Sequence, residues 1–260
     1  MHRGRYERAF RFDRTHRDHH RRRQRHRQSL YARIRQGGAR VVAADIDGAA
    51  AKSVAEALAA EGLEAIGLAT DIASEDSANA MAQAALERFS AIDVLINNAS
   101  LMSVLPRRSW LEIPVEEWDR VMAVNLRGMF LSCRAVFPAM QAQRRGKIVN
   151  ISSSRVWEGT PNRLHYATSK AGVIGFTRAL AREVGEFGIT VNAVTPGMTQ
   201  SETQVASSSA NYLATRIAGR AIERVQVPAD LVGAVMFLSS AASDFMTGQT
   251  INVDGGKAMH

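Results

Sequence analysis

Short apolar runs alternate with longer segments of helix-forming composition from Gly37 to the end of the chain. The apolar runs are residues 39–45, 63–71, 92–99, 146–153, 189–197 and 249–256. The helix-forming segments are residues 48–62, 74–89, 115–144, 164–188 and 228–242. Near-continuous apolar strands separated by helices are typical of a parallel sheet covered on both faces. The alternation therefore predicts an α/β fold in which residues 37–260 form a single domain around a doubly wound parallel sheet.

The positive charge of the chain is concentrated at its start. Residues 1–36 hold thirteen arginines against three acidic residues, a net charge of +10. Subtracting this from the +8 of the whole chain leaves −2 for residues 37–260. A strongly basic protein often binds nucleic acid or a membrane surface, but here the part predicted to fold is close to neutral. We therefore expect neither nucleic acid nor a membrane as a partner.

The cysteine content and the hydropathy exclude other classes of protein. Cys133 is the only cysteine, so an internal disulfide and a four-cysteine zinc site are both excluded. No apolar run is long enough to cross a bilayer, and the first residues lack the apolar core of a secretory signal. These features predict a cytoplasmic protein without a metal site.

Tyr166 and Lys170 are four residues apart in the segment YATSK, on one face of the predicted helix 164–188. A phenol has a reference pKa near ~10 and is a poor acid or base at neutral pH. A lysine cation one helical turn away favours the phenolate and lowers that pKa. The pair therefore indicates that Tyr166 transfers a proton.

Two further polar residues stand where they can assist this chemistry. Ser153 ends the apolar run 146–153, thirteen residues before Tyr166, where its hydroxyl can bond a substrate oxygen. Asn125 lies inside a long helical segment, although a mid-helix asparagine costs helix stability and usually needs a reason. We interpret Asn125 as the holder of a water in a proton relay, and the alternative is a satisfied buried amide.

Acidic residues follow the first two apolar runs. Asp45 ends the first run, where a carboxylate can accept hydrogen bonds from both ribose hydroxyls of an adenosine and repel a 2′-phosphate. This favours NAD over NADP, and the alternative is a solvated turn acid beside Asp47. Asp71 ends the second run and could hold the adenine amino group, with a similar alternative.

Six motifs occur in a recognisable order: DVLINNA, VNLRG, KIVNISS, YATSK, ITVNAVTPG and TGQTINVDGG. With them, about residues 37–258 resemble the short-chain dehydrogenase/reductase family in order and spacing. The C-terminal half is similar to NAD-dependent alcohol dehydrogenases and to 3-oxoacyl-carrier-protein reductases of that family. The resemblance implies a Rossmann-like fold, a homotetramer, and NAD(P)-dependent hydride transfer between an alcohol and a ketone.

The family's site residues carry over onto matching positions. The resemblance implies that Tyr166 is the general acid/base, that Lys170 lowers its pKa and binds the nicotinamide ribose, and that Ser153 orients the carbonyl. It implies that Asn125 holds the relay water. It places these further residues against the cofactor: Ile72, Asn98, Pro196, Gly197 and Thr199.

The surroundings of the site contain one departure from the family. Ser100 stands where the family usually has glycine, and we expect a modest effect because serine is small. His165 and Trp157 flank the site, and we expect each to be a packed side chain or a pocket wall rather than a catalytic group. The candidates for lining a small alcohol or ketone substrate are Leu101, Met102, Trp157, Met198, Val205 and Tyr212.

The family's first strand and its glycine-rich turn, Thr-Gly-x-x-x-Gly-x-Gly, are missing from this sequence. The glycines of such a turn let a pyrophosphate rest on a helix N-terminus. Residues 1–36 contain one glycine, Gly4, and an Arg/His-rich run, HHRRRQRHRQ, at residues 19–28. Buried, unpaired charges and imidazoles cost several kcal/mol, so we predict that residues 1–36 are irregular. The first strand and the turn should be disrupted, and cofactor affinity should be much reduced or absent.

A shifted reading frame accounts for this segment. Read one nucleotide late, codons for residues 20–27 permit Thr-Gly-Gly-Gly-Ser-Gly-Ile-Gly, and codons for residues 14–19 permit Gly-Arg-Ile-Val-Ile-Ile. Two compensating single-nucleotide slips, near residues 13 and 36, would produce the printed sequence. The alternatives are an Arg/His-rich nucleic-acid tail and an Arg-rich transit segment. With such a tail, the chain could also be a non-enzymatic binding protein on the same scaffold.

Overall fold

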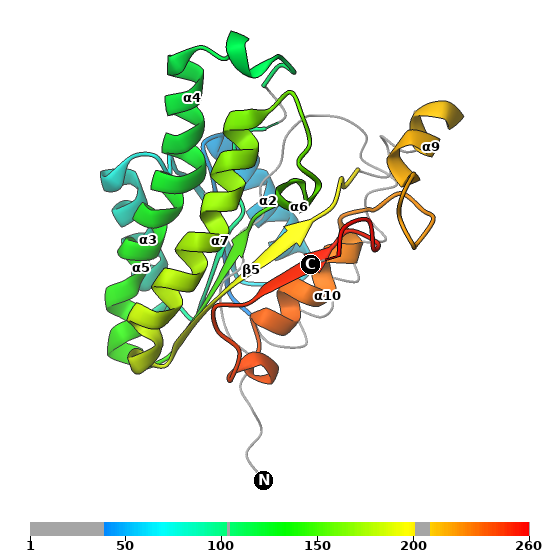
Figure 1. The fold of residues 1–260 in the computed structure, drawn as a ribbon. Helices are drawn as coiled ribbons and strands as arrows, with labels where there is room; N and C mark the ends of the chain where they lie inside the picture. The colour runs from blue at the N-terminus through cyan, green and yellow to red at the C-terminus, as the bar shows by residue number, and fades with distance from the viewer. Residues whose placement is uncertain (1–38, 103–104, 201–208, 260) are drawn as a thin grey trace.

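Parallel strands form the centre of the molecule, with helices on both sides (Figure 1). A computed structural model describes residues 39–102, 105–200 and 209–259. The strands are β1 (Val41–Asp45), β2 (Ala65–Ala69), β3 (Val94–Asn97), β4 (Gly146–Ile151), β5 (Ile189–Pro196) and β6 (Thr250–Val253). The main helices are α2 (Gly48–Ala60), α3 (Glu75–Phe89), α4 (Val115–Met122), α5 (Gly128–Gln143), α6 (Arg155–Glu158), α7 (Leu164–Val184), α9 (Ala210–Ile217) and α10 (Ala229–Leu238).

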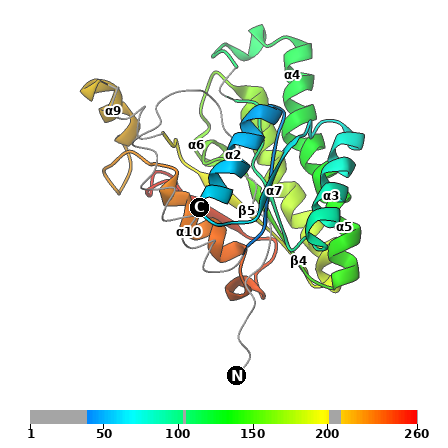
Figure 2. The ribbon, with the colours of Figure 1, turned by 180° about the vertical axis from the view of Figure 1, so that it is seen from behind.

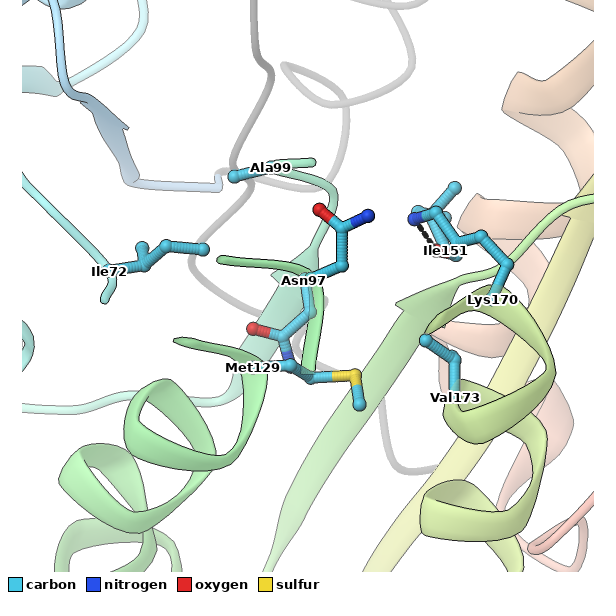
Figure 3. Close-up of a pocket in the computed structure, with 8 residues that line it drawn as sticks. Ile72, Asn97, Ala99, Met129, Ile151, Lys170 and Val173 are labelled. Carbon is cyan, nitrogen blue, oxygen red and sulfur yellow. Dashed lines mark hydrogen bonds between the residues drawn. The ribbon is translucent and has the colours of Figure 1, made fainter. Parts of the chain in front are cut away.

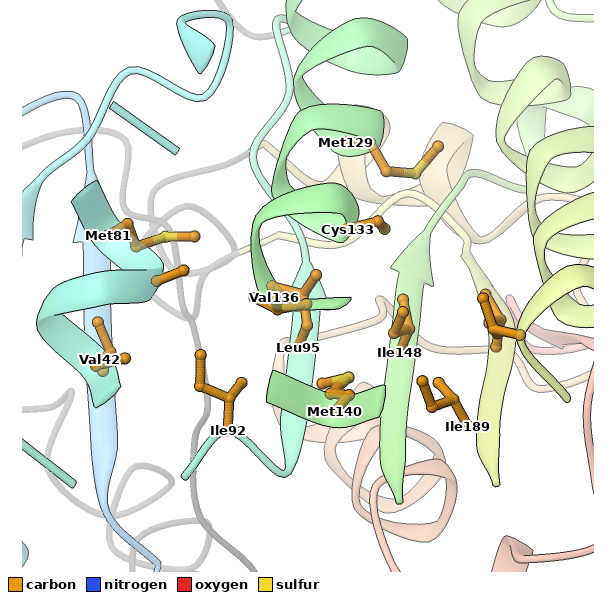
Figure 4. Close-up of a cluster of buried hydrophobic side chains, with 14 of the residues drawn as sticks. Val42, Met81, Ile92, Leu95, Met129, Cys133, Val136, Met140, Ile148 and Ile189 are labelled. Carbon is orange, nitrogen blue, oxygen red and sulfur yellow. The ribbon is translucent and has the colours of Figure 1, made fainter. Parts of the chain in front are cut away.

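Successive residues of each strand point to opposite faces, and two apolar clusters result. Val42 of β1 and Leu95 of β3 face a cluster that contains side chains of α3, α5 and α7 (Figure 4). Val41 and Ile96 face the other cluster, which contains side chains of α2 and α10. The two ribbon views show α5 and α7 on one side and α10 on the other (Figures 1 and 2). The predicted α/β fold with helices on both faces is therefore confirmed.

The strands are paired in two separate groups. β1 pairs with β2, and the second group has the order β3-β4-β5-β6, with every pair parallel. Although β1 and β3 are not hydrogen-bonded to each other, their side chains enter the same two apolar clusters. On one side of this division the chain continues from β1 to β2, and on the other side it continues from β3 to β4. The division is therefore a topological switch point. Residues 1–36, on which the prediction of a disrupted first strand rests, lie outside the described residues.

The observed elements match the sequence pattern closely, with two exceptions. The predicted helix 115–144 is interrupted by a π-helical turn, η2 (Ala123–Arg127). The sequence pattern gave no helix between residues 200 and 226, where the structure has helix α9. Short 3₁₀ turns at Trp110–Glu112, Gly185–Phe187 and Ala241–Ser243 complete the fold.

Candidate active site

The predicted site residues gather at one edge of the strands. Asp45 ends β1, Asn98 follows β3, Ser153 follows β4, and Gly197 follows β5. Because parallel strands bring their carboxyl ends to the same edge, these residues surround the switch point between β1 and β3. α7 crosses this edge with its first turns and supplies Tyr166 and Lys170.

Ser153 and Tyr166 meet at the centre of this edge. Both side chains are buried, with 8% and 5% of their surface exposed. They share a hydrogen bond, and the backbone N–H of Arg155 donates to the Ser153 Oγ over 3.3 Å. The neighbouring Ser152 ties β4 to α7, since its hydroxyl donates to the carbonyl of Lys170 over 2.7 Å. This geometry places a hydroxyl and a phenol where both can bond one substrate oxygen.

The pKa of Tyr166 is raised above its ordinary value because the phenol is buried. The hydrogen bond to Ser153 and the positive charges of Arg155 and Arg163 lower it, but burial has the larger effect. The expectation that Lys170 lowers this pKa is therefore not met in this structure. The physical reason is that burial removes the water that would stabilise a phenolate.

Lys170 lies deep beside Tyr166, with its Nζ 5.8 Å from the centre of the phenol ring. Its ammonium donates to the carbonyl oxygen of Ile151 over 2.7 Å (Figure 3). Burial lowers the pKa of Lys170 to about 8, because a buried cation loses hydration. Lys170 can thus gain and lose a proton near neutral pH.

Asn125 lies in the π-helical turn, and its amide is fully engaged. Its Oδ1 accepts from the N–H of Leu101 over 2.7 Å, and its Nδ2 donates to the Ser169 hydroxyl over 2.9 Å. The structure therefore shows the satisfied buried amide that was the alternative interpretation. π-helical turns are frequent at functional sites because they shift backbone groups out of the helical pattern.

A small cavity lies between Asn125 and Lys170. Its lining comprises Ile72, Asn97, Ala99, Asn125, Met129, Ile151, Lys170 and Val173 (Figure 3). The volume that the centre of a water molecule can occupy in it is about 10 Å³, so the cavity has room for about one water. The polar atoms in its wall make it suitable for a water that contacts the lysine.

The residues expected at the adenosine end differ in their surroundings. The Asp45 carboxylate is partly exposed, and its Oδ1 accepts from the Asp47 N–H over 2.9 Å. Asp47 caps α2 by accepting from the N–H groups of two alanines. Asp71 is exposed and accepts from the N–H of Ala73, whereas Ile72 is buried in the cavity wall. Asn98 is half-buried directly after β3.

The segment after β5 is fixed against the last strand. The Gly197 N–H donates to the Val253 carbonyl over 2.9 Å, and a Cβ at this glycine would lie 2.8 Å from Cβ of Asp254. Only glycine therefore allows this close approach. The Thr199 hydroxyl donates to the Gly197 carbonyl over 3.1 Å. The segment thus holds Gly197 and Thr199 at the edge that carries the other site residues.

The flanking residues behave as packed side chains. His165 is fully buried, and its Nε2 lies 3.0 Å from Oε1 of Glu117. Trp157 is half-buried and donates to Thr195 over 3.4 Å. Leu101 and Met198 are half-buried and Met102 is exposed, while Val205 and the Tyr212 side chain lie outside the described part.

A buried polar network below the site was missed in the sequence. Asn97 of β3 donates to the Asn150 side chain of β4 over 2.9 Å, and Asn150 donates to Thr177 of α7 over 2.9 Å. Asn97 and Asn150 are paired in register. Their signal was an asparagine directly after at least two apolar residues in each run. The network locks β3, β4 and α7 together directly beneath Lys170.

Comparisons with known proteins agree with this geometry. A family model described as enoyl-(acyl carrier protein) reductase matches residues 31–258. The chain belongs to the short-chain dehydrogenase/reductase family. It is thus an oxidoreductase that acts on an alcohol or carbonyl group with NAD(P).

Curated members of the family are similar over most of the chain. A 3-oxoacyl-[acyl-carrier-protein] reductase of Synechocystis is 36% identical, covering 81% of this chain and 83% of that protein. The (2S)-[(R)-hydroxy(phenyl)methyl]succinyl-CoA dehydrogenase subunit BbsD of Thauera aromatica is 34% identical, covering 87% and 90%. A 3-oxoacyl-[acyl-carrier-protein] reductase FabG of Staphylococcus aureus is 36% identical, covering 80% and 83%.

The described residues offer polar groups to both nucleoside ends of a dinucleotide. Asp45 presents a carboxylate at one end, and the Lys170 ammonium lies at the other. No glycine-rich turn for the diphosphate occurs in the printed sequence. Within residues 39–102, 105–200 and 209–259, three or more His, Cys, Asp or Glu residues are nowhere grouped to hold a metal ion. In the same ranges, no helix has the length and apolar character needed to cross a membrane.

Proposed function

We propose that this reductase interconverts a small secondary alcohol and a ketone, with Tyr166 as the general acid/base. The observation that carries the proposal is the buried group of Ser153, Tyr166 and Lys170 at the switch point. A ketone oxygen placed there can accept hydrogen bonds from the Ser153 hydroxyl and the Tyr166 phenol. Both donors stabilise the negative charge that develops on this oxygen during reduction.

The raised pKa of Tyr166 suits the direction of reduction. The phenol remains protonated at neutral pH and can give its proton to the carbonyl oxygen. Lys170, with a pKa of about 8, can then resupply the proton through a water in the cavity that Asn125 lines. A nicotinamide, when bound, supplies the hydride that reduces the carbonyl carbon.

The residues that would hold the cofactor are those at the strand edge. We assign Asp45 to the adenosine ribose, Asp71 and Ile72 to the adenine side, and Asn98 and Lys170 to the nicotinamide ribose. Gly197 and Thr199 would meet the nicotinamide amide. The segment Asp45–Asp47 carries two acids and no cation, so a 2′-phosphate would be repelled. We infer a preference for NAD over NADP on this ground.

The substrate class follows from the relatives only as a proposal. Two of them are named for the reduction of a 3-oxoacyl group, so a 3-oxoacyl thioester is the first ketone to test. The half-buried Leu101, Trp157 and Met198 offer apolar walls for such a chain. Family resemblance also leads us to infer a cytoplasmic homotetramer.

The test is the oxidation of NADH, followed by absorbance, with a panel of ketones that includes a 3-oxobutanoyl thioester of N-acetylcysteamine. We expect turnover, and a fall in kcat of about 100-fold or more in Tyr166→Phe. The variant keeps the ring, so its circular dichroism and melting curve should match the parent. Equal turnover by parent and variant would refute the assignment of Tyr166.

A further inference from the structure

Arg220 is a buried cation in the segment between α9 and α10, with 6% of its surface exposed. Its guanidinium joins two parts of the chain. The Nη2 donates to the Met198 carbonyl over 3.0 Å, and the Nη1 donates to the Arg224 carbonyl over 3.0 Å. Met198 lies between Gly197 and Thr199, the two residues that would meet the nicotinamide amide. Arg220 therefore bonds directly to the backbone of that segment.

Gln226 holds the same segment at both of its ends. Its carbonyl accepts from the Gln200 N–H over 2.9 Å, and its backbone forms a parallel bridge with Thr199. Its side-chain Nε2 donates to the Val253 carbonyl over 2.7 Å, and that carbonyl also accepts from the Gly197 N–H. Residues 197–200 are thus held at each end by backbone bonds, and Arg220 holds the carbonyl between them.

The C-terminal turn supports the side chain of Arg220. The Ile222 N–H donates to the Gly255 carbonyl over 2.9 Å, and Figure 1 shows this segment, in orange, next to the C-terminal turn, in red. A Cβ at Gly255 would lie 3.4 Å from the Arg220 Cδ. The Asp254 carboxylate fixes the turn, because it accepts from the three N–H groups that follow Gly255. Arg220 therefore packs against a turn that has its own hydrogen bonds.

The guanidinium of Arg220 binds carbonyl oxygens, while the acid of the same segment is engaged elsewhere. Asp230 accepts from both terminal nitrogens of Arg224, over 2.7 and 2.6 Å, and from the Val227 N–H over 2.9 Å. Burying a cation costs free energy that an apolar side chain would not cost. The planar fork of an arginine, in return, fixes the directions of two acceptors relative to each other. This arrangement indicates that the position of the two carbonyls matters.

We propose that Arg220 is a positioning residue for the cofactor: by holding the Met198 carbonyl, it sets the backbone that meets the nicotinamide amide. The inference rests on the proposed function, which assigns Gly197 and Thr199 to that amide. Loss of Arg220 should loosen the nicotinamide side of the site and leave the two catalytic hydroxyls in place.

Hydrogen–deuterium exchange of the full chain tests this hold without any cofactor. We expect Arg220→Gln to raise the exchange rate of the amides of residues 197–200 by about 10-fold or more, since a loosened segment opens more often. Arg220→Lys should give a smaller increase, because it keeps the charge but not the fork. This second variant decides the test if Arg220→Gln does not fold.

The control for exchange is Arg144→Gln. It removes a bond from an exposed arginine to the Glu186 carbonyl, before the start of β4 and so at the opposite edge of the strands. It should leave the exchange of residues 197–200 at the parental rate. Parental exchange of these amides in Arg220→Gln, or an equal increase in β4, would overturn the proposal.

A cofactor analogue shows whether the hold acts on the nicotinamide. The reduced 3-acetylpyridine analogue of NADH carries a methyl ketone in place of the amide, so it cannot donate the hydrogen bonds of that amide. We expect Arg220→Gln to lower kcat/KM for NADH by about 10-fold, mainly through KM, and kcat/KM for the analogue by less. An equal fall for both cofactors would reduce Arg220 to a structural role and overturn the proposal.

Calorimetric titration with NADH separates this inference from the ketone reduction. Weaker binding of NADH in Arg220→Gln, in a chain that reduces no ketone of the panel, would support the positioning role and refute the ketone reduction. Ketone reduction with parental kcat/KM for NADH in Arg220→Gln would do the reverse. The exchange measurement decides whether Arg220 holds residues 197–200 even in a chain that binds no NADH.

Discussion

Lys170 shows how one buried side chain links folding to pH. Its ammonium donates to the Ile151 carbonyl, but no carboxylate among the described residues forms an ion pair with it. Its pKa is lowered from 10.5 to about 8 by burial. The unfolded chain therefore binds the proton more tightly than the folded chain does, and the charged lysine destabilises the fold below about pH 8.

We predict that this penalty shrinks as the pH rises from about 7.5 to about 9.5. The stability of the parent, relative to Lys170→Met, should increase by about 2 kcal/mol over this range. Urea unfolding of both chains at the two pH values measures this change. The control is Lys52→Met, at an exposed position of α2, which should show no such trend. A relative stability that falls with pH would contradict the lowered pKa.

Asp45 is the residue on which the cofactor preference depends. We predict that Asp45→Ala lowers the ratio of kcat/KM for NADH to that for NADPH by about 10-fold, since both the ribose hydrogen bonds and the repulsion of a 2′-phosphate are lost. The measurement compares both cofactors with one ketone. Asp119→Asn, on an exposed position of α4, is the matched control. A parent that already prefers NADPH would show the inference from Asp45 to be wrong.

For helices and strands, the sequence predicted those elements whose formation depends on a local pattern of residues. Apolar runs predicted all six described strands, and the segment 74–89 was correctly expected to form the helix α3, which Ser74 caps. The π-helical turn around Asn125 was missed because its extra residue is compensated by contacts with Leu101 and Ser169, distant in sequence. The sequence predicted a lowered pKa for Tyr166, whereas its pKa is raised in the structure. The depth at which the phenol is buried depends on packing between distant elements, and the spacing of residues in the sequence does not reveal it.

The contact of α2 with β2 depends on a single glycine. A Cβ at Gly67 would lie 2.5 Å from backbone atoms of Ala51 and Lys52. We predict that Gly67→Ala lowers the free energy of unfolding by about 2 kcal/mol, because the helix must move away from the strand. Gly175→Ala is the control: this glycine is on the exposed side of α7 with nothing within 4 Å, and the substitution should stabilise by about 1 kcal/mol. Denaturant unfolding tests both, and equal effects would contradict the packing argument.

For the whole molecule, the division between β1 and β3 is the central feature. Side chains of both strands enter the same apolar clusters, yet the two strands are not paired. A strand in this position would be buried on both faces and should be apolar. The printed residues 14–19, RTHRDH, have the wrong chemistry for it. The domain boundary near residue 36 and the shifted reading frame are proposals. Both concern the strand that would lie between β1 and β3.

A chain with residues 14–36 read one nucleotide late tests them together. We predict that it binds NADH by calorimetry and melts at a higher temperature, since an apolar strand would be buried and a glycine turn would receive the diphosphate. The printed chain should bind NADH at least about 10-fold more weakly, because the backbone N–H groups of the glycine turn no longer bond the diphosphate. A chain with the shifted segment scrambled has the same composition and should behave like the printed one. If the printed chain binds NADH as tightly as the shifted chain, the glycine turn is not needed to hold the diphosphate. The proposal of a shifted reading frame would then lose its functional support.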